Sequence, residues 1–100
     1  MNLKEAAGKV PVYTGSDTTP YILVDFPSHQ EFLSLYYKKA RAKSLPVYWN
    51  ILKRRSQGMT LTQAGFPHAI TRERVRQIEA KFLRIFREAY FAKESSSKKG

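Results

Sequence analysis

The sequence predicts a small, mainly α-helical domain with a C-terminal helix-turn-helix and room for a short β-hairpin before the helices. Three observations support this fold class: two helix-capping motifs, proline or glycine between the helical segments, and an apolar stripe at three-and-four spacing near the C-terminus. The 100 residues suit one domain with one modest core. A content of 42% apolar and 13% aromatic residues argues against wholesale disorder.

The N-terminal part is β-prone rather than helical. Two apolar runs, 10–13 and 21–26, flank the turn-forming stretch 15–19. They can form a small hairpin, which would need helices to pack on because two strands alone are marginally stable in water. We therefore assign residues 1–28 to an extended segment and residues 29–93 to a helical domain.

Two helices are expected next. A capping box at Ser28 and Glu31 opens a helix predicted for residues 29–43. Pro46 interrupts it and suits the first turn of a second helix, over 46–57. Cations near the end of that helix either complement the helix dipole or bind phosphate, and both interpretations stay open for Lys53, Arg54 and Arg55.

A third, short helix is predicted after the second capping box, formed by Thr60 and Gln63. Pro67 cannot continue this helix, so residues 66–69 must form a turn. Gly65, just before the turn, allows two helices to approach closely.

The last predicted helix is long. Thr71 caps its start, and the pattern continues to about Ala92. Residues 94–100 are polar and low in complexity, so a disordered tail is expected there. One side of this helix carries an apolar stripe formed by Val75, Ile78, Phe82, Ile85, Phe86 and Ala89.

The chain is strongly basic, with a formal net charge of +10 and a pI near 10.1. Residues 29–58 carry +6 and residues 59–87 carry +4, whereas residues 1–28 carry −1. This distribution indicates a polyanionic partner that meets the chain after residue 28. Nucleic acid is the first candidate, and the alternative is that the charges form solvated helix faces.

Composition excludes most other functions. Cysteine is absent and His29 and His68 are the only histidines, so we expect no metal site, no cofactor and no small-molecule substrate. No paired carboxylates, phosphate loop or nucleophile–base arrangement suggests an enzyme. The longest apolar run is too short to span a bilayer, and a membrane partner is not expected. Without a signal peptide, we expect a cytosolic protein.

The first turns of the last helix carry the residues that suit base recognition. A recognition helix enters the major groove with these turns, where Arg can clamp a guanine edge, Gln an adenine edge, and Glu can accept from a cytosine amino group. Lys81 and Arg84 continue the same side of the helix, opposite the apolar stripe, and would meet phosphates. The residues assigned to base contacts are Arg72, Glu73, Arg76 and Gln77.

Residues 60–87 closely resemble region 4 of bacterial primary sigma factors, with the string TRERVRQIEAK over 71–81 at their centre. In that family this segment is the helix-turn-helix that binds the promoter −35 element. The resemblance implies base contacts by the four residues above. It also implies contacts to the DNA backbone or to an activator, which we assign to Thr60, Thr71, Arg74, Lys81 and Arg84. Arg74 and Glu79 have a simpler alternative as solvated or intrahelical charges.

The sequence also departs from this family. Pro67 lies where the first helix of the family usually continues, so a reshaped turn is expected. Residues 1–58 resemble neither sigma region 2 nor region 3, and a regulator from a phage or mobile element fits this arrangement. The alternative function is an adaptor that binds the flap of the RNA polymerase β subunit, with aromatic residues as its docking surface: Phe32, Tyr36, Tyr37, Tyr48 and Trp49.

Overall fold

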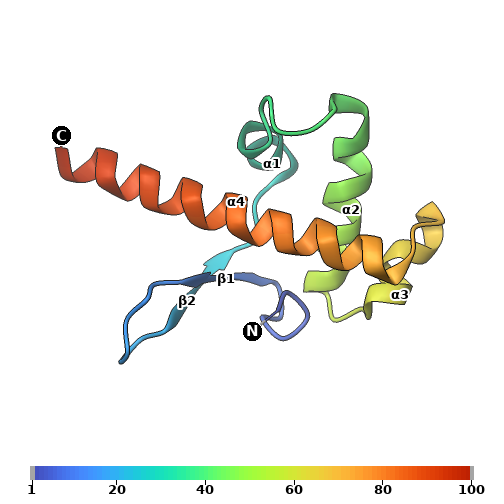
Figure 1. Ribbon diagram of the computed structural model, residues 1–100, viewed down its shortest axis with the longest axis horizontal. Helices are drawn as coiled ribbons and strands as arrows, with labels where there is room; N and C mark the ends of the chain where they lie inside the picture. The colour runs from blue at the N-terminus through green and yellow to red at the C-terminus, as the bar shows by residue number, and fades with distance from the viewer. Residues whose placement is uncertain (1, 100) are drawn as a thin grey trace.

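The computed structural model describes the backbone of residues 2–99 and the side chains of residues 2–92. Two strands come first, β1 (Lys9–Tyr13) and β2 (Tyr21–Asp25). They are followed by the helices α1 (His29–Leu35), α2 (Leu45–Ser56), α3 (Leu61–Gly65) and α4 (Arg72–Lys99). Short 3-10 turns cover Ala42–Ser44 and Phe66–His68. The domain is therefore mainly α-helical with an N-terminal hairpin, as predicted (Figure 1).

Helix α4 is the element on which the others pack. In Figure 1 it runs along the long dimension of the molecule, with α1 above it, the hairpin below it and α2 crossing it. The predicted apolar stripe forms its buried side, and the five residues from Val75 to Phe86 in that stripe belong to the hydrophobic core. The helix extends to Lys99, beyond the end predicted near Ala92. The side chains of the predicted tail, 94–100, lie outside the described residues, so its disorder stays a prediction.

The hairpin is an integral part of this core. Its strands pair antiparallel, from Lys9 with Asp25 to Tyr13 with Tyr21. Val10 and Val12 are completely buried, and Arg87 on α4 donates a hydrogen bond from Nε to the Tyr13 carbonyl at 2.9 Å. The hairpin thus has the helical partner that the sequence required of it.

Helix α1 is shorter than predicted: it ends at Leu35, not at residue 43. The backbone of Lys38 is left-handed, with φ of +60°, which a right-handed helix cannot contain. The Lys39 N–H closes a turn onto the Tyr36 carbonyl at 2.8 Å. Residues 36–41 are therefore a turn segment between α1 and α2. The capping box at the start of α1 is confirmed.

Helix α2 follows its prediction closely. It carries Pro46 in its first turn and ends at Ser56. Gly58, two residues on, has a φ of +100°, the conformation that commonly terminates a helix. The Gly8 N–H donates to the Ser56 carbonyl at 2.8 Å. The end of α2 therefore also anchors the turn that directly precedes β1.

Candidate nucleic-acid interface

The turn between α3 and α4 has helix-turn-helix connectivity. The Thr60–Gln63 capping box opens α3, as predicted. Pro67 lies in the 3-10 turn that directly follows α3, and Ala69 then takes a left-handed conformation with φ of +54°. Two tight bends therefore separate α3 from α4, and the turn expected at 66–69 is confirmed.

Gly65 lets the two helices of this motif come together. A Cβ at this position would lie 2.5 Å from the Ile70 carbonyl oxygen and 2.7 Å from Cγ2 of Val75. Both distances are too short for a side chain, so only glycine fits without a shift of the backbone. The Ile70 N–H donates to the Gly65 carbonyl at 3.1 Å, which ties the end of α3 to the start of α4.

The four residues assigned to base contacts are all exposed on the first turns of α4. Thr71 caps this end through its Oγ1, which accepts from the Arg74 N–H at 3.3 Å. Val75 and Ile78, which lie on the same turns of the helix, are buried in the core. The described part of the chain therefore leaves the predicted reading face uncovered, which consists of Arg72, Glu73, Arg76 and Gln77.

Glu73 and Arg76 pair with each other on this face. Arg76 Nη2 lies 2.5 Å from Glu73 Oε1, and Arg76 Nε donates to Oε2 at 3.0 Å. This hydrogen bond lowers the pKa of Glu73 and raises the pKa of Arg76. An exposed pair of this kind contributes little to stability and can open when a ligand competes. The Arg76 guanidinium, which has several N–H donors, and the Glu73 carboxylate, which is an acceptor, therefore lie side by side at the surface.

Arg74 links the reading face to α2. Its Nη2 donates to the Tyr48 hydroxyl at 2.9 Å, and its Nη1 lies 3.4 Å from Oε1 of Gln77. The guanidinium carbon also lies 5.8 Å from the centre of the Tyr48 ring. The simpler alternative for Arg74, a purely solvated or intrahelical charge, is therefore incomplete, because its partner Tyr48 lies on another helix.

Arg55 and Glu79 form a contact that the sequence did not reveal. Arg55 Nε lies 2.6 Å from Glu79 Oε1, and both side chains are almost fully buried. Arg55 was expected to complement the helix dipole or to bind phosphate, and neither interpretation accounts for a buried guanidinium that is paired with a carboxylate. The interpretation of Glu79 as a solvated charge is wrong, because its side chain is buried. The signal was weak because the partners are separated by 24 positions and each lies among other charges.

The basic surface extends beyond the helix-turn-helix. No acidic residue occurs between Glu31 and Glu73 in the sequence. Lys81 Nζ donates to the Lys39 carbonyl at 3.1 Å, which holds the turn segment 36–41 beside α4. Four exposed cations therefore lie on residues 36–44, next to the predicted reading helix: Lys38, Lys39, Arg41 and Lys43.

The remaining predicted contact residues are also at the surface. Thr60 and Thr71 are exposed, and their hydroxyls accept hydrogen bonds from the backbone N–H groups of the helices that they cap. Lys81 and Arg84 are exposed farther along α4. Their exposure agrees with the predicted backbone contacts, which stay a prediction.

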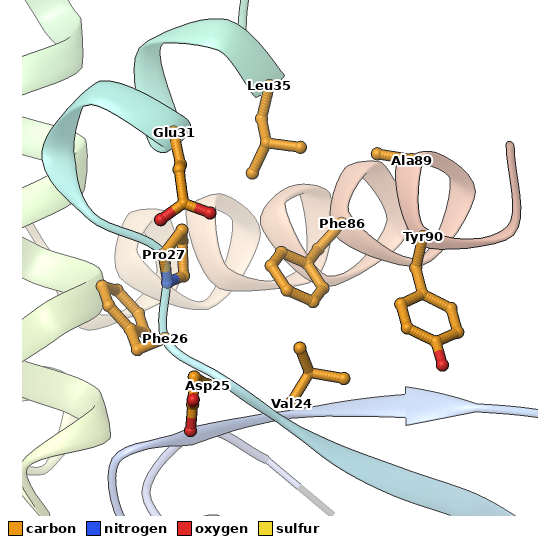
Figure 2. A pocket seen from close by; sticks show the side chains of 9 residues that line it. All are labelled: Val24, Asp25, Phe26, Pro27, Glu31, Leu35, Phe86, Ala89 and Tyr90. Carbon is orange, nitrogen blue, oxygen red and sulfur yellow. The ribbon is translucent and has the colours of Figure 1, made fainter. Parts of the chain in front are cut away.

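Another hollow lies away from this face, beside the C-terminal half of α4. It has a volume of about 450 Å³ between β2, α1 and α4. Figure 2 shows Leu35, Phe86 and Val24 directed into it, with Tyr90 at one end. The two carboxylates in its lining, Asp25 and Glu31, have other partners, because Asp25 pairs with Lys9 and Glu31 accepts from the Ser28 N–H. Within the described part of the chain, this hollow therefore contains no cluster of reactive groups that are free of other partners.

Among residues 2–92, no group of histidine and carboxylate side chains could hold a metal ion. Within the described part of the chain, no helix is long and apolar enough to cross a membrane. Comparisons with protein-family models, curated proteins and solved structures gave no match to this chain. The resemblance to sigma region 4 therefore stays a prediction that is based on the residues of 60–87.

Proposed function

We propose that this protein is a transcription regulator that binds duplex promoter DNA through the major groove with the N-terminal turns of α4, in the manner of sigma region 4. The observation that carries the proposal is the exposed set Arg72, Glu73, Arg76 and Gln77 on one helix end. These side chains supply the guanidinium, amide and carboxylate groups that distinguish base edges in the major groove. In this role the protein is a binding protein of the bacterial cytosol or nucleoid, not an enzyme.

The basic surroundings of this helix end support the proposal. Lys81 and Arg84 on α4 and the cations of residues 36–44 flank the reading face. Among the described residues, the carboxylates nearest in sequence to this surface already have partners, Glu73 with Arg76 and Glu79 with Arg55. Phosphates on both sides of a major groove would therefore meet unneutralised cations, which supply affinity without sequence information.

The test is selection of duplexes from a random-sequence library, followed by affinity measurements at two salt concentrations. Gln77→Ala and Arg76→Ala should reduce discrimination at single base pairs by about 1–3 kcal/mol. Arg84→Ala is the matched control, because it should weaken binding to all sequences alike and lower the salt slope by about one. Selected duplexes are expected to resemble a −35 element. Equal affinity for every duplex would overturn direct base recognition.

A second function, docking on the β flap of RNA polymerase, keeps one supporting observation. Most of the aromatic residues that suggested it are not available, since Phe32 and Tyr36 are buried and Tyr48 and Trp49 are half-buried. Tyr37, with 73% of its surface exposed, and Leu33 remain at the surface on and after α1. Retention of the chain by an isolated flap domain, abolished in Tyr37→Ala, would support this role, and no retention at micromolar concentration would exclude it.

A further inference from the structure

A small pocket opens beside α4, next to the predicted reading residues. It has a volume of about 60 Å³, room for about two water molecules and too little for a nucleobase. Three elements line it: the end of α1, the second turn of α2 and the first half of α4. The lining residues are Tyr36, Tyr48, Arg74, Gln77, Ile78 and Lys81.

The Tyr36 hydroxyl in this pocket is buried and has no hydrogen-bond partner among the described residues. Tyr36 is only 1% exposed, and its ring stacks on Phe32 with ring centres 4.5 Å apart, so the hydroxyl is held in place. The pKa of Tyr36 is raised well above its usual value, mainly by burial and to a smaller extent by the nearby Tyr48 hydroxyl. The group therefore stays protonated and can donate a hydrogen bond. A buried donor without a partner costs stability, which suggests a partner that is supplied from outside.

The rest of the pocket is cationic. Arg74 and Lys81 border it, and within the described part of the chain neither forms an ion pair. Their contacts are neutral: Arg74 donates to the Tyr48 hydroxyl, and Lys81 to the Lys39 carbonyl. None of the described residues places a carboxylate in the lining of the pocket. Two cations with hydroxyl donors and no acid form a site for an anion.

We propose that this pocket binds one phosphate of the DNA backbone, with Arg74 and Lys81 as its charged contacts and the Tyr36 and Tyr48 hydroxyls as additional donors. The proposal rests on the proposed function and deepens it. Gln77 belongs both to the pocket wall and to the reading face. A phosphate held here therefore fixes the register of α4 in the groove, because backbone contacts position a recognition helix. Tyr36 and Tyr48 lie outside the helix-turn-helix, which gives the α1 end and α2 a direct role in DNA binding.

The test compares Tyr36→Phe with Tyr37→Phe on a duplex selected by the wild-type chain. Tyr36→Phe removes only the hydroxyl and keeps the stacked ring, so we expect about tenfold weaker binding to all duplexes with an unchanged or higher melting temperature. Tyr37→Phe, which alters an exposed neighbour, should leave both values unchanged. A single neutral methylphosphonate, moved along the duplex, should weaken wild-type binding at one position and cause no additional loss there in Tyr36→Phe.

The outcomes separate the two proposals. Failure of the wild-type chain to bind any duplex overturns both. Tight wild-type binding with an unaltered Tyr36→Phe affinity overturns the phosphate pocket and leaves base recognition intact. A Tyr36→Phe loss that comes with a lower melting temperature and an unchanged methylphosphonate profile also overturns the pocket, since it shows a structural effect. Saturation of the Tyr36 ring signals in NMR by inorganic phosphate at low millimolar concentration and constant ionic strength would identify a free-anion site and overturn the DNA assignment.

Discussion

Arg55 on α2 and Glu79 on α4 are joined by two hydrogen bonds, from Nε to Oε1 at 2.6 Å and from Nη2 to Oε2 at 3.4 Å. Arg55 Nη1 also donates to the Met59 carbonyl at 2.9 Å. The guanidinium therefore connects α2, the segment before α3 and the N-terminal third of α4. This buried pair sets how α4 lies against α2, and with it the direction of the predicted reading face.

Removal of one partner of this pair should destabilise the domain strongly. Glu79→Ala leaves the Arg55 charge buried and unpaired, so we expect the free energy of unfolding in urea to fall by about 3–5 kcal/mol. The double variant Arg55→Met/Glu79→Leu should recover most of that loss. Glu88→Ala, at an exposed position on the same helix, is the control and should stay within about 0.5 kcal/mol of wild type. An effect of Glu79→Ala as small as that of Glu88→Ala would contradict this account.

Gly65→Ala should disturb both stability and the proposed DNA binding. The new methyl group meets the Ile70 carbonyl and Val75, so α3 and α4 must separate at a cost of about 1–3 kcal/mol. Gly58→Ala is the comparison, because it forces a left-handed alanine at about 1–2 kcal/mol but meets no atom within 4 Å. Under conditions in which both variants are folded, only Gly65→Ala should weaken duplex binding. Equal DNA affinities of the two variants would show that the close approach at Gly65 does not position α4.

The pKa of Glu73 should lie below the usual value for glutamate, about 4.3, because Arg76 donates to its carboxylate. The folded-state pKa is the lower one, so the contribution of the pair to stability is complete above the usual value and disappears as the pH falls through the lowered pKa. NMR titration of the side-chain carboxyl carbon measures this directly. Arg76→Ala should return the midpoint toward the usual value, whereas Arg84→Ala should leave it unchanged. A Glu73 titration midpoint that is the same in Arg76→Ala as in wild type would show that the two side chains do not pair in solution.

Tyr36 should make the domain sensitive to alkaline pH. Its pKa is raised by burial in the folded chain, while in the unfolded chain it ionises near pH 10. Above that pH the unfolded state binds fewer protons, so the free energy of unfolding falls as the pH rises. Urea unfolding at several alkaline pH values should show a shallower decline for Tyr36→Phe than for wild type. Tyr37→Phe should keep the wild-type slope, and identical slopes in all three proteins would refute the burial of an ionisable Tyr36.

The parts of the fold that the sequence predicted correctly depend on local chemistry. The capping boxes at Ser28 and Thr60 need only a partner three residues away, and both are present. Pro67 excludes a continuous helix wherever it stands. The stripe from Val75 to Phe86 repeats often enough to define the buried side of α4, and the exposed positions follow from it.

The parts that were missed depend on distant partners. The left-handed backbone at Lys38 ends α1 early, and lysine itself gives no sign of that conformation. Arg55 is one of three cations in the last turn of α2, which in the sequence look like a solvated helix end. Only the packing of α2 on α4 brings Arg55 to Glu79. Tyr36 had the spacing of a helix residue, but nothing local indicates that its hydroxyl is buried beside Arg74 and Lys81. Contacts between elements therefore determined the details of the site.

The packing of β1 on α4 has a consequence for how the chain folds during its synthesis. The hydrogen bond from Arg87 to the Tyr13 carbonyl spans 74 positions, and Val10 and Val12 share one core with Phe82. A ribosome adds about 5–20 residues per second, so the first strand leaves the exit tunnel seconds before its helical partner. The apolar side of the nascent hairpin therefore stays exposed to solvent during this time. The hydrophobic core can form only after most of α4 has been synthesised.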